Sequence, residues 1–299
     1  RKSKDIDITT SATPEEVISY FSNVKNTGKK YGSVTVLKDA YKYEVTTYRM
    51  DGAYIKNRKP EEVTFTKSLE EDLKRRDFTM NAVVLDENED VVDLFGGRDD
   101  IKNHVIRSIG DPNKRFTEDA LRMLRAFRFS SQLGFDIDSE TIKALEAQKH
   151  LIKNISIERI MVELSKLFVG PHKQKAIRYL VDTNFHKELY GLAQGLEYLQ
   201  GVALEYNPLQ AFTACFILND IEEIWKFSNR EMKVMLRAIN LHEVTKEGQW
   251  NKYILFSQGE EICLFTNEVS VLLGYEDQSI DIKNIWNSLI VKDVCDLKF

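Results

Sequence analysis

The stretch RFTEDALRMLRAFRFSSQL, residues 115–133, lies where the chain changes from one pattern of residues to another. Its apolar side chains recur at the spacing of an α-helix, which advances about 100° per residue. One stripe along that helix is formed by Ala120, Leu121, Leu124 and Phe127. The pattern predicts a single amphipathic helix from Thr117 to about Leu133.

The polar face of this predicted helix has two interpretations, and both remain open. Glu118 and Arg122 have the spacing of an ion pair on a solvated surface. Alternatively, Asp119 only accepts hydrogen bonds and Arg122 only donates them, which matches the amino group and ring nitrogen of cytosine or adenine. Uracil and guanine present the reverse order and would leave a buried charge unpaired. The second interpretation predicts a site that accepts C and A and rejects U and G.

Residues before this stretch alternate between strand and helix patterns. Thr13, Pro14 and Glu16 predict a helix with a capping box over residues 13–21, and SLEEDLKRR predicts another over residues 68–76. Residues 96–110 predict a loop, a short helix and a final strand. Other strands are predicted at residues 5–10, 33–37, 41–49, 63–66, 78–86 and 90–95.

From about Asp111 onward the strand signal disappears and helical periodicity takes over. Further helices are predicted at residues 139–148, 157–168, 174–183, 209–219 and 230–240. The sequence therefore predicts an α+β protein, with an N-terminal mixed α/β domain followed by an all-helical remainder.

Composition limits the classes of protein that remain. The chain has 299 residues, of which 42% are hydrophobic and 30% charged, enough for two or more domains. No run approaches the roughly 20 apolar residues of a membrane span, and no signal peptide is evident. Three widely spaced cysteines indicate neither a disulfide framework nor a zinc site, so we expect a reducing, cytoplasmic setting.

Charge is unevenly distributed along the chain. The net charge of −5 argues against indiscriminate coating of nucleic acid, although a local basic surface remains compatible with it. Such a surface is predicted by a group of cations: Arg107, Lys114, Arg115, Arg122, Arg125 and Arg128.

DIDITT, residues 5–10, places two carboxylates on one side of a strand. Side chains alternate along a strand, so Asp5 and Asp7 point one way while Ile6 and Ile8 point the other. Either that face is solvated or a divalent cation lies between the carboxylates. The spacing alone does not choose between them.

Several segments in order closely resemble the bacterial class II tRNA nucleotidyltransferases, the family of the CCA-adding enzymes, whose core the bacterial poly(A) polymerases share. The segments are DIDITTSATPEEV, YEVTTYR, LKRRDFTMNAVVLD, DLFGGRDDI and RFTEDALRMLRAFRF. The resemblance is dense over residues 1–170 and fades beyond them. It implies a polymerase β-like head at residues 1–110, a helical neck at 111–172 and a helical body at 173–299.

The resemblance also implies a mechanism and its residues. Asp5 and Asp7 would bind two Mg²⁺ ions, with Glu44 as a third carboxylate or, alternatively, an ordinary strand residue. The 3′-hydroxyl of a tRNA would attack the α-phosphate of CTP or ATP. The nucleotide pocket would use Arg76, Asp119, Arg122, Arg125 and Arg128. Asp77 and Asn81 either organise that pocket or serve as local hydrogen-bonding residues.

The resemblance leaves open which nucleotides the protein adds and whether it is catalytic. The loop RMDGAYIKNRKP, residues 49–60, resembles a flexible segment that family members use to switch from CTP to ATP, and it carries Arg49, Asp51 and Arg58. Its presence favours full CCA addition, and an ordinary charged loop is the alternative. The family's Gly-Gly segment before the first strand and its C-terminal helices are not in this chain, so we expect a fragment. An enzyme adding only CC or only A, a poly(A) polymerase, and a non-catalytic tRNA-binding remnant remain alternatives. The oligomeric state is left open by the sequence, with a homodimer as one alternative.

Overall fold

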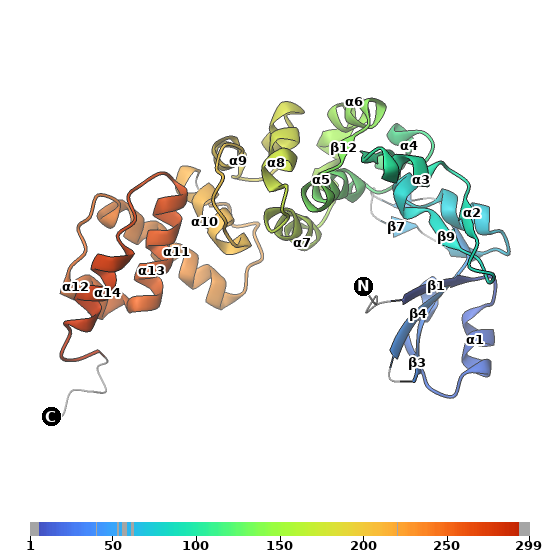
Figure 1. The fold of residues 1–299 in the computed structure, drawn as a ribbon, viewed down its shortest axis with the longest axis horizontal. Helices are drawn as coiled ribbons and strands as arrows, with labels where there is room; N and C mark the ends of the chain where they lie inside the picture. The colour runs from blue at the N-terminus through green and yellow to red at the C-terminus, as the bar shows by residue number, and fades with distance from the viewer. Residues whose placement is uncertain are drawn as a thin grey trace. The chain divides into compact units, whose positions relative to one another are not determined.

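The computed structural model describes residues 6–39, 41–52, 54–55, 59–60, 63–219 and 221–292. Figure 1 traces the chain from strands near the N-terminus to helices near the C-terminus. The chain divides into two compact units, which are described separately. The first comprises Arg1–Met123 and Asp136–Ile155, and the second Leu124–Phe135 and Ser156–Phe299.

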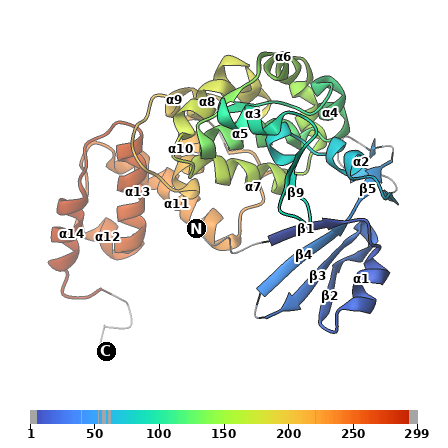
Figure 2. The ribbon, with the colours of Figure 1, turned by 45° about the vertical axis from the view of Figure 1, so that its right-hand side comes forward.

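A four-stranded sheet with the order β1-β4-β3-β2 forms part of the first unit. β1 runs parallel to β4, and the other two pairings are antiparallel. Helix α1 (Pro14–Tyr20) lies against one face of this sheet, as Figure 2 shows. The strands are β1 (Ile6–Thr10), β2 (Val24–Gly28), β3 (Ser33–Lys38) and β4 (Tyr41–Thr47).

The covered face of the sheet is apolar because side chains alternate along each strand. Val17 of α1 packs with Val34, Val36 and Val45 in one buried cluster. The opposite face carries the polar residues between these valines. The strand predictions for β1, β3 and β4 are confirmed, whereas β2 was not predicted because VKNTG contains turn-forming residues.

The predicted capping box of α1 is confirmed. The Glu16 backbone N–H donates to Thr13 Oγ1 at 3.3 Å, and the Thr13 N–H donates to Glu16 Oε2 at 2.7 Å. The backbone hydrogen bond from Thr13, assisted by its side chain, lowers the pKa of the Glu16 carboxyl. Pro14 occupies the first helical turn, so the local sequence alone determines where this helix begins.

The segment predicted to be a loop at residues 49–60 contains paired strands in its described parts. β5 (Arg49–Asp51) pairs with β8 (Val63–Phe65), and β6 (Tyr54–Ile55) pairs with β7 (Lys59–Pro60), both antiparallel. Arg58 lies outside the described residues.

The remainder of the first unit departs from the sequence prediction at residues 78–86 and at β12 (Asp136–Ile137), a short strand in the part predicted to be all-helical. The strand expected over residues 78–86 forms only as β9 (Val83–Leu85), because Thr79–Asn81 is a 3₁₀ turn. The Thr79 hydroxyl donates to Asp100 at 2.7 Å and holds the chain in that turn. The other elements are α2 (Leu69–Lys74), β10 (Val91–Asp93), α3 (Gly97–Lys102), β11 (Val105–Ile106), β12 (Asp136–Ile137) and α6 (Ser139–Gln148).

The prediction of one helix from Thr117 to about Leu133 is wrong at its start. The structure has two helices, α4 (Pro112–Glu118) and α5 (Leu121–Leu133), because Asp119 adopts an extended backbone with φ −135° and ψ 101°. The Leu121 N–H donates to Asp119 Oδ1 at 3.1 Å, so this carboxylate serves the new helix start. The predicted apolar stripe is confirmed as buried.

The second unit is helical throughout its described elements. Aromatic rings fill its interior, with Phe212 in edge contact with Phe168 at 5.3 Å between ring centroids. None of the described helices is long and apolar enough to cross a membrane. After α5 the helices are α7 (Ile157–Phe168), α8 (Lys173–Asp182), α9 (Ala193–Leu199), α10 (Pro208–Leu218), α11 (Asn229–Thr245), α12 (Lys252–Gln258), α13 (Glu260–Leu272) and α14 (Ser279–Asn287).

We expect Gly195→Ala to destabilise the second unit. A Cβ at this position in α9 would lie 2.4 Å from Cys215 Cα in α10, so the two helices must separate. Overpacking of this kind costs about 1–3 kcal/mol, which outweighs the gain of up to ~1 kcal/mol in helix propensity. Thermal unfolding checks the expectation. Gly201→Ala is the matched control because its Cβ would meet only Tyr198 O, at 3.8 Å, and an equal loss there would contradict the packing argument.

Candidate functional site

The open face of the sheet brings together two of the predicted acidic residues. Asp7 on β1 and Glu44 on β4 are register partners in the parallel pair, so their side chains point to the same face. That face is opposite the one covered by α1, and both side chains are exposed. Asp5 lies outside the described residues.

The donor chemistry of this face fits a divalent cation. Adjacent carboxylates repel each other unless a cation compensates them, and hard cations such as Mg²⁺ prefer carboxylate oxygens. Among the described residues, no group of three or more His, Cys, Asp or Glu side chains could hold a metal. Asp7 and Glu44 are thus the described members of a proposed set that also includes Asp5.

A buried carboxylate that sequence reasoning missed lies on the same side of the sheet, where it bonds Thr9 of β1. Asp72 of α2 is 0% exposed, and both of its oxygens accept hydrogen bonds. Oδ1 accepts from Arg75 Nη2 at 2.8 Å and from the Arg49 N–H at 3.2 Å. Oδ2 accepts from Arg76 Nη2 at 3.3 Å and from Thr9 Oγ1 at 3.4 Å. Partial burial, together with the charge of Asp72, raises the pKa of the nearby Tyr48 hydroxyl.

Local hydrogen bonds also fix the turn that follows α2. Asp77 Oδ1 accepts from the Phe78 N–H and from Asn81 Nδ2, both at 2.9 Å. Arg76 Nη1 donates to the Asn81 carbonyl at 3.0 Å. Asp77 and Asn81 therefore form local hydrogen bonds, and through Asn81 the same turn holds Arg76.

Arg122 is packed against the end of α2 rather than on a solvated surface. Its Nη2 donates to the Arg75 carbonyl at 2.8 Å, and only 7% of the residue is exposed. Its Nη1 donates to Glu118 at 3.1 Å, so the ion pair considered from the sequence is formed. Asp119 is half-buried and lies between α4 and α5. The segments RRDF and EDALR are therefore in direct contact.

Arg125 and Arg128 belong to the part of α5 in the second unit. Arg128 is 7% exposed and forms an ion pair with Glu163 of α7 at 3.1 Å. Its guanidinium carbon lies 4.1 Å from the centre of the Phe129 ring, and that of Arg125 lies 5.3 Å from the same ring. Both arginines thus stack on a ring of their own helix, and their binding of nucleotide stays a prediction.

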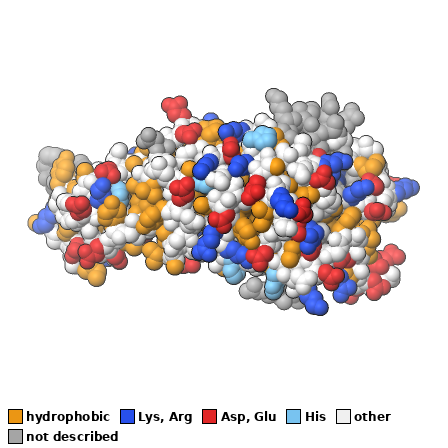
Figure 3. Space-filling view, turned by 90° about the horizontal axis from the view of Figure 1, so that it is seen from above, with side chains coloured by type: hydrophobic (Ala, Val, Ile, Leu, Met, Phe, Trp, Pro, Cys, Tyr) orange, Lys and Arg blue, Asp and Glu red, His pale blue; other side chains and the backbone are white. Residues whose placement is uncertain are grey.

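The predicted basic surface between Arg107 and Arg128 is wrong for two of its six cations, Arg122 and Arg128, which are buried. Arg122 and Arg128 point inward, and Arg107 forms ion pairs with Asp100 and Asp138. Helical periodicity buries Arg122 beside Glu118 and Arg128 beside Glu163, whereas Lys114 stays exposed and Arg107 half-exposed. On the face shown in Figure 3, acidic and basic side chains are interspersed.

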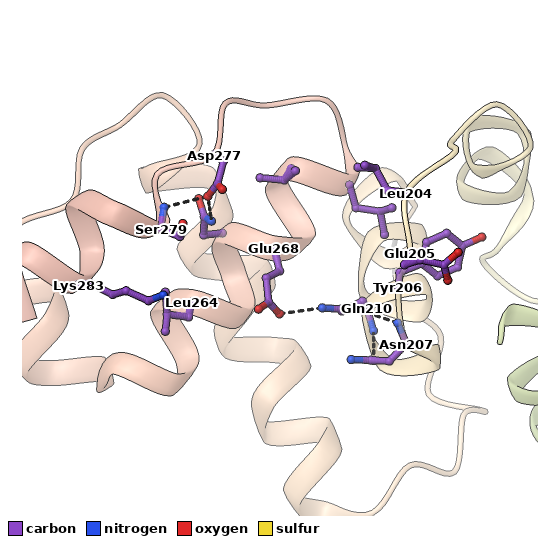
Figure 4. A pocket seen from close by; sticks show the side chains of 13 residues that line it. Leu204, Glu205, Tyr206, Asn207, Gln210, Leu264, Glu268, Asp277, Ser279 and Lys283 are labelled. Atoms are coloured by element: carbon purple, nitrogen blue, oxygen red, sulfur yellow. Dashed lines mark hydrogen bonds between the residues drawn. The ribbon is translucent and has the colours of Figure 1, made fainter.

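One pocket lies beside predicted site residues and another lies far from them in the sequence. A small cleft of about 280 Å³ in the first unit adjoins the end of α2 and is lined by Met50, Glu71, Lys74, Arg75, Lys114, Arg115 and Glu118. Its cations outnumber its carboxylates. A larger pocket of about 660 Å³ lies in the second unit, where Gln210 of α10 donates to Glu268 of α13 at 2.7 Å (Figure 4). The residues that line the larger pocket include none of the predicted site residues.

Comparison with known protein families gives matches to separate parts of the chain. Residues 1–107 match the family model of the Poly A polymerase head domain, and residues 213–299 match tRNA nucleotidyltransferase domain 2. The open sheet face, Arg75 and Arg76 thus lie in a polymerase head domain, and the C-terminal helices lie in a tRNA nucleotidyltransferase domain, so the fold and site define a nucleotidyltransferase.

Individual relatives define the family more narrowly. The chain is 40% identical to a CCA-adding enzyme from Lactobacillus helveticus, covering 98% of this chain and 76% of the relative. It is 38% identical to one from Bacillus pumilus, covering 99% and 77%. A crystal structure of the Bacillus stearothermophilus CCA-adding enzyme in complex with CTP matches with a TM-score of 0.84 at 33% identity, covering 98% and 76%. The chain belongs to the family of bacterial CCA-adding enzymes, which are tRNA nucleotidyltransferases.

Proposed function

We propose that this chain adds C, C and A to the 3′ end of tRNA, without a template, from CTP and ATP. The observation that carries the proposal is the pairing of Asp7 with Glu44 on the open sheet face, in a chain similar to CCA-adding enzymes over almost its whole length. Because tRNA and nucleoside triphosphates are cytoplasmic substrates, the activity is placed in the cytoplasm.

The carboxylates of the open face supply the reactive centre. Asp5, Asp7 and Glu44 hold divalent cations, for which Mg²⁺ is the proposed metal. When bound, Mg²⁺ lowers the pKa of a hydroxyl and neutralises charge on a phosphate leaving group. In the reaction the tRNA 3′-oxygen attacks the α-phosphorus, the hydroxyl proton is lost, and the bond to pyrophosphate breaks.

The arginines and Asp119 bind and select the nucleotide. Arg76, at the end of α2, contacts the triphosphate, because its side chain is partly exposed and cationic. Asp119 accepts from the base amino group and Arg122 donates to the ring nitrogen, while Arg125 and Arg128 position the base-reading helix α5. Catalysis is assigned to the head at residues 1–110 and base selection to the neck at residues 111–172, while residues 173–299 form the helical body.

One incorporation assay tests the proposal. A tRNA lacking its 3′ end is incubated with the protein, Mg²⁺ and each labelled nucleotide singly, and then with CTP and ATP together. We expect CMP addition from CTP alone and completion of the terminus when ATP is also present. Incorporation of AMP alone would favour the poly(A) or A-only alternatives, and CMP without AMP a CC-only enzyme. Retention of tRNA without Mg²⁺-dependent incorporation would identify a non-catalytic remnant.

A further inference from the structure

Asp72 is a fully buried carboxylate whose two oxygens both accept hydrogen bonds and which the proposed chemistry does not use. The residue is fully buried and is reached from three separate elements: β1, β5 and the end of its own helix α2. We propose that Asp72 is the positioning residue that fixes Arg76 relative to the carboxylate strand β1, and thereby determines nucleotide affinity. This inference rests on the proposed function of the open sheet face.

The hydrogen bonds to Oδ2 carry the geometric part of the inference. Thr9 and Arg76 donate to this one oxygen, at 3.4 Å and 3.3 Å. Thr9 lies two positions after Asp7 on β1, so both side chains point to the same face of the sheet. Asp72 Oδ2 therefore links the Arg76 guanidinium to the carboxylate strand β1, while the Asn81 carbonyl accepts from its other terminal nitrogen at 3.0 Å.

The charges around Asp72 support the second part of the inference, the effect on nucleotide affinity. Asp72 pairs with Arg75 at 2.8 Å and with Arg76 at 3.3 Å, so one carboxylate faces two guanidinium groups and a net positive charge remains. The Arg76 side chain is 29% exposed, whereas that of Arg75 is 18% exposed. Arg76 is thus the more accessible of the two to an anion such as a nucleotide phosphate. Asp72 orients this cation without cancelling it.

The test uses Asp72→Asn, which keeps the size of the side chain and removes its charge. An amide places N–H donors against one guanidinium and releases Arg76. We expect the Kd for CTP, measured directly by equilibrium binding, and the KM for CTP to rise about 10- to 100-fold, the range of a lost hydrogen bond to a charged group. The KM for tRNA should remain within about twofold of wild type.

A double-mutant cycle with Arg76→Ala separates positioning from general stability. If Asp72 acts through Arg76, adding Asp72→Asn to Arg76→Ala leaves the Kd for CTP unchanged. Asp100→Asn is the matched control: Asp100 is 7% exposed in the same unit and bonds Thr79 and Arg107. This control should lower the Tm while keeping the CTP affinity.

The outcomes are separable. The inference is overturned if Asp72→Asn binds CTP with wild-type affinity. It is also overturned if the two substitutions raise the Kd for CTP independently, so that their effects add fully in the double variant. In either case the incorporation assay can still support the proposed function. Absence of CTP binding and incorporation in the wild-type protein would refute the function and the inference with it.

Thr9→Val provides a second test if Asp72→Asn does not fold, because it removes only the bond between β1 and Oδ2. We expect it to raise the Kd for CTP about twofold to tenfold, and an unchanged Kd would contradict the proposal.

Discussion

Asp7→Asn is expected to abolish nucleotide addition while leaving the fold unchanged. Asp7 is exposed on the open face of the sheet, so its replacement by a side chain of equal size removes no packing. It does remove a charged oxygen ligand next to Glu44, its register partner on β4. We expect kcat to fall by about 10³- to 10⁴-fold, the scale on which a central catalytic group acts. Incorporation of labelled CMP at saturating CTP and tRNA measures the loss.

A carboxylate on the other side of the sheet provides the control for this prediction. Glu15 of α1 is exposed and pairs with Lys29 at 3.1 Å, away from the open face. Glu15→Gln removes the same charge from the same domain and should keep the wild-type rate. If Asp7→Asn added CMP as fast as Glu15→Gln, the assignment of the carboxylate face as the reactive centre would be wrong. Glu44→Gln should also lower kcat, which tests the partner strand independently.

Helices were predictable where their signals are local. The bounds of α6 and α7 agree with the predicted residues 139–148 and 157–168, because the apolar period lies within each segment; Asp138 also caps the start of α6. The break between α4 and α5 was not predictable in this way. The apolar residues Phe116 and Ala120 keep helical spacing across Asp119, and no glycine or proline marks the interruption.

The site was predictable in its residue types but not in its supporting contacts. Alternation along β1 places Asp7 on a polar face, yet its pairing with Glu44 depends on how two distant strands align. Asp72 is one of several acids in SLEEDLKRR, and nothing local distinguishes it from Glu70 or Glu71. Its partner Thr9 is 63 residues away in the chain, so only the tertiary structure reveals the role.

Asp119→Ala is expected to relax the exclusion of UTP while lowering addition of C and A alike. If Asp119 accepts from the amino group of cytosine or adenine, its removal deletes the contact that those bases share and uracil lacks. Each lost base contact is worth about 1–3 kcal/mol, which is about a 5- to 150-fold loss in the ratio of kcat/KM for CTP over UTP. Single-nucleotide incorporation with each of the four triphosphates measures that ratio.

The structure gives the same carboxylate a second role, and the controls must separate the two. Asp119 Oδ1 accepts from the Leu121 N–H at the start of α5, so its loss also costs about 1 kcal/mol of stability. Asp111→Ala removes an equivalent cap from α4, where Asp111 accepts from the Asn113 N–H at 2.9 Å, and should keep the base preference. Asp119→Asn retains an acceptor oxygen for the cap but adds an amide donor, which matches the carbonyl of uracil. If Asp119→Asn incorporates UMP at near-normal stability, the carboxylate is responsible for base selectivity. If both Asp119 variants keep the wild-type preference for CTP over UTP, Asp119 serves only as a helix cap.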